Sequence, residues 1–173
     1  MVRAFCLVLL LILAGCAGDN PPQVLAPQVD LHRYAQRWYI IANIPYFAEA
    51  GKVGSWFDIS LTGPDRFTDV YWSRKATLGA PAESFTMQGY VVPDTNNAYW
   101  RETPLWPFYL SYLILYVDPE YRYALVGYPG RDYGWVLSRD PVMDDATYQR
   151  LLGIFAAKGY DPAKFVRIPQ RSG

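Results

Sequence analysis

The sequence predicts an all-β protein whose strands pair antiparallel, either as a barrel or as a sandwich, with one helix near the C-terminus. Residues 108–139 alternate strands rich in aromatic and β-branched residues with short turns of Pro, Gly and Asp. The same unit recurs upstream, and no helix-period segment separates these strands. Connections this short force neighbouring strands to run antiparallel, which excludes a fold of alternating strands and helices.

The elements follow in order from this pattern. A short helical turn precedes the first strand, and a long loop (43–55) follows it. Beyond the last strand Asp144 can cap a helix whose apolar side chains fall on one face, and Gly159 ends it. That face is expected to pack on the outside of the sheet, and residues 165–168 form a short final strand. The strands are expected at 36–42, 56–61, 67–72, 84–92, 98–102, 109–117, 121–127 and 133–138.

The N-terminus has the pattern of an export signal. One Arg is followed by about ten apolar residues and then small residues, a block too short for a mature membrane anchor. Leu13, Ala14, Gly15 and Cys16 resemble the lipobox of bacterial lipoproteins, which implies cleavage before Cys16 and its acylation, for example with palmitate. The alternative is an ordinary secretory signal with an incidental Cys. Residues 1–15 are therefore expected as a signal peptide and 16–28 as a lipidated N-terminus and proline-bearing tether.

Composition and motifs argue against several functions. The 16 basic and 16 acidic residues balance, so no basic surface for nucleic acid is expected. His32 is the single histidine, and the chain has no Gly-x-Ser-x-Gly motif, no metal-ligand spacing and no phosphate-binding Gly-rich loop. We therefore expect neither an enzyme nor a cofactor or metal. Aromatic residues make up 17% of the chain, and they either fill a β core or line a cavity.

The start of the expected domain resembles a known family. The residues that carry the resemblance precede and begin the first strand: Asp30, Leu31, Arg33, Tyr34, Trp38, Tyr39, Ile41 and Ala42. They are similar to the opening signature of the lipocalins, particularly the bacterial lipocalins and their apolipoprotein D relatives. The resemblance covers 29–170, which we take as the lipocalin domain, and leaves 171–173 as a tail. Gln36 departs from the family pattern, which usually has Gly there.

The resemblance implies an eight-stranded antiparallel up-and-down β-barrel with the C-terminal helix outside. It implies that Trp38 seals the closed end and that Arg139, at the end of the last barrel strand, packs across Trp38 as a structural floor. Such barrels are wide enough to hold one small ligand, and side chains alternate inward and outward along each strand. The loop after the first strand would fold over the open mouth, where Ile44, Tyr46 and Phe47 would form a lid or simply pack.

Alternation from these anchors gives the candidate ligand-binding residues. Counting from Trp38 places Ala42 inside, and counting from Arg139 places Trp135 inside. On the sixth strand both phases are apolar, so the resemblance selects Tyr112, Ile114 and Tyr116, while pattern alone suggests Phe57, Tyr71 and Trp100. Each aromatic residue has the alternative of solid core or outer surface.

The function expected from this resemblance is that of a lipoprotein anchored through Cys16 to the bacterial outer membrane, facing the periplasm. It would bind a fatty acid, a lysophospholipid or a related lipid for storage or transport in envelope maintenance. Lys52 or Arg74 at the mouth would meet an acidic head group. The alternative is a structural or interaction lipoprotein whose barrel is filled by its own side chains. The sequence leaves the oligomeric state open, a homodimer included.

Overall fold

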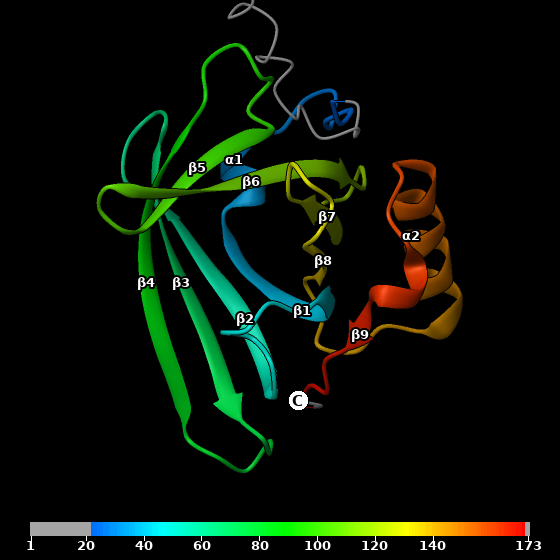
Figure 1. Ribbon diagram of the computed structural model, residues 1–173. Helices are drawn as coiled ribbons and strands as arrows, with labels where there is room; N and C mark the ends of the chain where they lie inside the picture. The colour runs from blue at the N-terminus through cyan, green and yellow to red at the C-terminus, as the bar shows by residue number, and fades with distance from the viewer. Residues whose placement is uncertain (1–21, 172–173) are drawn as a thin grey trace, which may run out of the picture.

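The computed structural model describes residues 22–171, which form an antiparallel β-barrel with a helix against its outside (Figure 1). The sheet order is β2-β3-β4-β5-β6-β7-β8-β1-β9, and β1 also pairs with β2, so eight strands close into a ring. This confirms the predicted barrel. The ring strands are β1 (Gln36–Ile44), β2 (Lys52–Leu61), β3 (Arg66–Lys75), β4 (Ala82–Val91), β5 (Tyr99–Leu105), β6 (Phe108–Val117), β7 (Tyr123–Gly127) and β8 (Gly134–Ser138).

The remaining elements lie at the two ends of the described chain. Helix α1 (Leu31–Tyr34) precedes β1, and α2 (Asp145–Ala157), the 3-10 turn η1 (Pro162–Lys164) and β9 (Val166–Arg167) follow β8. Asp144 caps α2 by accepting from the Thr147 amide at 2.8 Å, as the sequence predicts. Within residues 22–171 no helix is long and apolar enough to cross a membrane. The strand pairings and the cores described below also lie within this range, so a chain starting at Ala17 contains all of these pairings and both cores.

The closed end of the barrel is held by Arg139. Its Cζ lies 3.6 Å from the centre of the fully buried Trp38 ring, so the cation–π contact expected between them is present. The guanidinium also donates to four backbone carbonyls, those of Arg33 (2.6 Å), Tyr34 (3.1 Å), Arg37 (2.6 Å) and Tyr121 (3.2 Å). One side chain therefore ties α1, β1 and the β6–β7 turn to the end of β8.

Above this floor the barrel is solid. Trp100 lies between Phe67 and Tyr112, with ring centres 4.3 Å and 5.3 Å away, and the Tyr112 hydroxyl bonds the Tyr34 hydroxyl at 2.9 Å. Gly89 makes room for this layer because a Cβ there would overlap the Phe67 ring. A second apolar core joins α2 to the outside of β1 and β6–β8; Leu151, Leu152 and Phe155 contribute to it. The helix thus packs on the barrel as predicted.

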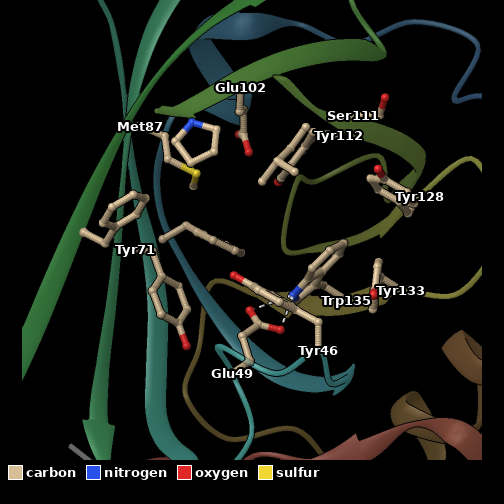
Figure 2. Close-up of a pocket in the computed structure, with 14 residues that line it drawn as sticks. Tyr46, Glu49, Tyr71, Met87, Glu102, Ser111, Tyr112, Tyr128, Tyr133 and Trp135 are labelled. Atoms are coloured by element: carbon tan, nitrogen blue, oxygen red, sulfur yellow. Dashed lines mark hydrogen bonds between the residues drawn. The ribbon is translucent and has the colours of Figure 1, made fainter. Parts of the chain in front are cut away.

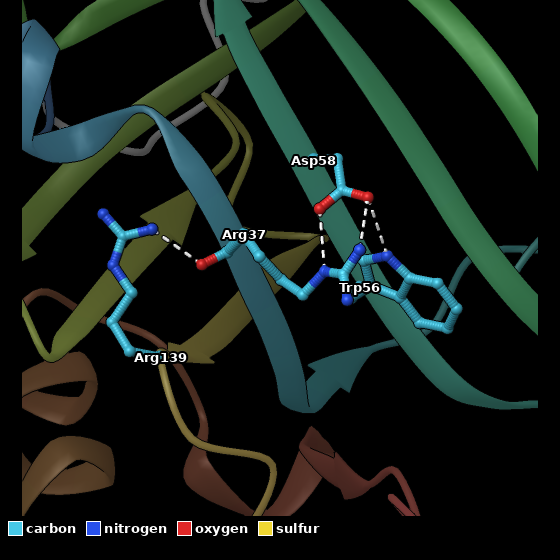
Figure 3. Close-up of polar contacts among 4 residues, drawn as sticks. All are labelled: Arg37, Trp56, Asp58 and Arg139. Atoms are coloured by element: carbon cyan, nitrogen blue, oxygen red, sulfur yellow. Dashed lines mark hydrogen bonds and ion pairs between the residues drawn. The ribbon is translucent and has the colours of Figure 1, made fainter.

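The seam between β1 and β2 is paired only near the closed end. Residues 36–39 of β1 pair with 56–59 of β2. Within this ladder the Arg37 side chain also donates two 2.8 Å hydrogen bonds to the Asp58 carboxylate (Figure 3). Asp58 also accepts from the Trp56 indole nitrogen at 3.0 Å. Because both strands contribute to this cluster, it reinforces the ladder where the barrel is closed.

Toward the mouth β1 and β2 separate, and the C-terminal segment (residues 165–170) fills the gap. Its strand β9 pairs with β1, and the Ile168 amide donates to the Ile41 carbonyl at 2.9 Å. The Gln170 side-chain amide bridges the two strands by donating to the Ile40 carbonyl (2.7 Å) and the Ser55 carbonyl (2.9 Å). The last residues of the domain therefore complete the wall that β1 and β2 leave open.

The structure differs from the predicted elements in several strand bounds; for example, β3 continues to Lys75 and β7 begins only at Tyr123. Strands β1 and β2 are longer than expected, so the loop between them shrinks to residues 45–51. Strand β5 continues to Leu105 through Pro104, which a register shift between Glu102 and Leu105 accommodates. Gln36 adopts a φ of +86°, so it keeps the left-handed backbone of the glycine it replaces.

Candidate ligand-binding cavity

A cavity of about 140 Å³ occupies the mouth half of the barrel, above the aromatic layer. Figure 2 shows its lining side chains converging from the strands and from the β1–β2 loop. Most are apolar or aromatic, and none is Lys, Arg or His. The residues that line it are Tyr46, Glu49, Phe57, Tyr71, Phe85, Met87, Glu102, Pro104, Leu110, Ser111, Tyr112, Tyr128, Tyr133 and Trp135.

The predicted binding residues divide between the cavity and the solid core. Four line the cavity: Trp135, which alternation from Arg139 selects, Tyr112, which the resemblance selects, and Phe57 and Tyr71, which the pattern suggests. Two others point into the barrel but lie outside the cavity lining. They belong to the packed core, and each is fully buried: Trp100 and Ile114. The closed half of the barrel is thus filled by its own side chains. The self-filled alternative expects this of the whole barrel, but the mouth half holds the cavity.

The inward placement expected for Ala42 and Tyr116 is wrong. Both belong to the core outside the barrel, beneath α2. Register shifts between Ile40 and Ala42 on β1, and between Ile114 and Tyr116 on β6, insert one residue into each strand. An extra residue reverses the alternation beyond it, so the positions that parity assigns to the interior turn outward.

Past the bulge in β1, Asn43 meets Glu49 from the β1–β2 loop. The Asn43 side-chain nitrogen donates to Glu49 Oε2 at 2.6 Å, and Trp135 Nε1 donates to Glu49 Oε1 at 3.0 Å. Glu49 is only 4% exposed, and burial raises the pKa of its carboxyl to about 7 against the opposing effect of these two bonds. A buried carboxylate therefore fastens the loop to β1 and β8.

The rest of the β1–β2 loop partly matches the predicted lid. Tyr46 lines the cavity and meets Tyr133 edge to face at 5.7 Å, so the loop contacts the β7–β8 turn. Ile44 ends β1 within the outer core, whereas Phe47 is 92% exposed. The basic side chains expected at the mouth do not line the cavity: Lys52 pairs with Glu83 at 3.1 Å, and Arg74 stacks 5.4 Å from the Trp56 ring.

A second buried acid lies at the inner end of the cavity. Glu102 of β5 is 4% exposed and lines the cavity. Its charge acts on the nearby Asp69 of β3, which is fully buried. As two carboxylates neither could donate to the other, and both Asp69 oxygens would lack a partner. Burial first, and the charge of Glu102 second, raise the pKa of Asp69 well above its usual value. Burial also raises the pKa of Glu102, to about 7.

Sequence reasoning overlooked these acids although a signal for one pair existed. Asp69 alternates with the inward Phe67 and Tyr71, and Glu102 lies two residues beyond the inward Trp100. Tyr133 lies two residues before the inward Trp135 in the predicted strand 133–138, so it carried the same signal, whereas Glu49 and Tyr128 stand in loops, where no periodicity shows direction. Within residues 22–171 no group of three or more His, Cys, Asp or Glu side chains could hold a metal ion.

The comparisons with known proteins agree with this architecture. Residues 29–170 match the protein family described as a lipocalin-like domain. The chain belongs to the lipocalin family. This lipocalin is 28% identical over 163 residues to the outer membrane lipoprotein Blc of Escherichia coli, covering 92% of this chain and 90% of that protein. It is 30% identical over 156 residues to temperature-induced lipocalin-1 of Arabidopsis thaliana, covering 82% and 80% respectively.

Solved structures show the same fold at lower identity. Insecticyanin of the tobacco hornworm Manduca sexta superposes with a TM-score of 0.71 at 18% identity, over 90% of this chain and 88% of that one. Membership in a family of proteins that bind small hydrophobic molecules agrees with the non-enzymatic role predicted from the sequence. The predicted lipid attachment at Cys16 and the signal peptide lie outside the described residues.

Proposed function

We propose that this lipocalin is anchored through acylated Cys16 to the outer membrane, faces the periplasm, and carries a single-chain lipid such as a fatty acid or lysophospholipid. The observation that carries the proposal is the cavity itself, because the mouth half of the barrel stays open while the closed half is packed solid. An apolar cavity with a few polar groups is the usual form of a small-molecule site. Each buried methylene of a chain contributes about 0.8 kcal/mol.

The size of the cavity limits how the lipid is held. Its volume of about 140 Å³ is below the roughly 300–1,000 Å³ of pockets that enclose drug-sized ligands. A long acyl chain therefore extends past Tyr46 and Glu49 or displaces the loop that carries them. Anchoring fits the resemblance of residues 13–16 to a lipobox and the name of the Escherichia coli relative, an outer membrane lipoprotein.

Native mass spectrometry of the chain from Ala17 onward tests the carrier function, followed by extraction and identification of any lipid. A stoichiometric lipid that is lost when Trp135 is replaced by Glu, with the circular dichroism spectrum retained, supports a carrier. Arg66→Glu is the matched control because Arg66 is an exposed barrel residue remote from the cavity lining. A protein that stays empty and takes up neither fatty acid nor lysophospholipid supports the self-filled alternative instead.

A further inference from the structure

The cavity lining holds two acids and no Lys, Arg or His. Glu102 at the inner end and Glu49 near the mouth are both nine-tenths or more buried, and the other lining groups that can ionise are tyrosines. In Figure 2 the two acids lie at opposite ends of the group of lining side chains. A buried carboxylate without a paired cation is costly, so this arrangement favours any ligand that brings the missing charge.

The two acids differ in what they lack. Both Glu49 oxygens accept hydrogen bonds from the protein, through Asn43 and Trp135. Glu102, by contrast, has one oxygen, Oε1, without a donor from the described residues. Asp69 is fully buried and does not line the cavity, so it is closed to a ligand. Glu102 is therefore the acid in the cavity lining whose capacity to accept hydrogen bonds is left unfilled.

From this geometry we infer that Glu102 is the head-group site for a lipid bearing a protonated primary amine, which enters the cavity with its ammonium group first. An ammonium group has three donors and no acceptor, which suits a site where Glu102 offers an acceptor that no described residue fills. A carboxylate head brings further acceptors and like charge, so a fatty acid would be repelled from the inner end. The inference rests on the proposed lipid-carrier function and narrows its ligand to one head-group class.

Three amphiphiles with the same twelve-carbon chain test the inference on the chain from Ala17: dodecylamine, dodecanol and dodecanoate. Isothermal titration calorimetry is made at about pH 8, where the amine is protonated and the fatty acid ionised. We expect dodecylamine to bind at least about tenfold more tightly than dodecanoate, with dodecanol between them. Equal or tighter binding of dodecanoate would overturn the inference while leaving the carrier function intact. Binding of none of the three contradicts the carrier function itself.

The variant Glu102→Gln locates the effect. It keeps the shape of the side chain and removes its charge, so the affinity for dodecylamine should fall at least about tenfold while that for dodecanol changes little. Glu120→Gln removes an exposed acid outside the cavity lining and should change neither affinity. An amine preference that survives Glu102→Gln would show that the charge at the inner end does not select the head group. The ligand series on the unaltered protein remains decisive if this variant does not fold.

Discussion

Replacing Arg139 by Met should destabilise the barrel more than the loss of an ordinary exposed charge. The substitution removes the cation–π contact with Trp38 and the four bonds to carbonyls at the closed end. The carbonyls of Arg33 and Arg37 are exposed enough to bond water afterwards, so we count only the bonds to Tyr34 and Tyr121.

The magnitude follows from those contacts. A hydrogen bond from a charged donor contributes roughly 1.5–3 kcal/mol, and a partly desolvated cation–π contact about 1–2 kcal/mol. Neighbouring interactions on one side chain are not additive, and Met retains part of the packing on Trp38. We therefore expect the free energy of unfolding to fall by about 3–5 kcal/mol. Arg139→Lys, which keeps the charge but not the planar fork, should lose about half as much.

Urea unfolding followed by tryptophan fluorescence and circular dichroism measures this loss. Arg66→Met is the matched control, since Arg66 also stacks on an aromatic ring, Tyr90 at 5.5 Å, but its side chain is 66% exposed. The control should lose less than about 1 kcal/mol. If Arg139→Met unfolds within about 1 kcal/mol of this control, Arg139 does not hold the closed end together and the reasoning above is refuted.

Three further predictions concern other parts of the chain. Gln36→Gly should raise the free energy of unfolding by about 0.5–1 kcal/mol, because glycine adopts a φ of +86° without strain; an unchanged or lower urea midpoint contradicts this. Glu49 has a folded pKa of about 7 against its usual 4.5, so its protonation favours folding, and stability falls as the pH rises from about 4.5 through 7. Relative to Glu49→Gln, which cannot titrate, the natural protein should lose up to about 3 kcal/mol between those limits; parallel curves of unfolding free energy against pH refute the shift. Cys16→Ser should abolish palmitate labelling and release the protein from the outer-membrane fraction, whereas retention there by the variant argues against the lipid anchor.

Much of the barrel could be predicted because its local patterns agree with the final fold. Tight turns of Pro, Gly and Asp define the meander, and Trp38 and Arg139 set its closed end. Alternation from Arg139 predicts Trp135 on the cavity wall, and the family resemblance predicts Tyr112 there; both line the cavity. These inferences hold because each depends on a few neighbouring residues.

The bulges could not be predicted in the same way. On β1 and β6 both faces are apolar, one toward the barrel interior and one toward α2, so a shift of phase leaves no trace in the hydrophobic pattern. Ala42 and Tyr116 were misplaced for this reason. Glu49 lies in a loop, and only the folded structure brings it to Asn43 and Trp135. The backbone of Gln36 could not be predicted either. Gln rarely adopts a positive φ, yet the surrounding structure holds Gln36 at a φ of +86°.

The C-terminal segment makes barrel closure a late event in the life of the chain. Its β9 and Gln170 seal the gap between β1 and β2, the first two barrel strands to be synthesised, more than a hundred residues earlier. A ribosome releases the N-terminal strands first, so for most of synthesis this part of the wall lacks its partner. The mouth cannot reach its final form until the last residues arrive.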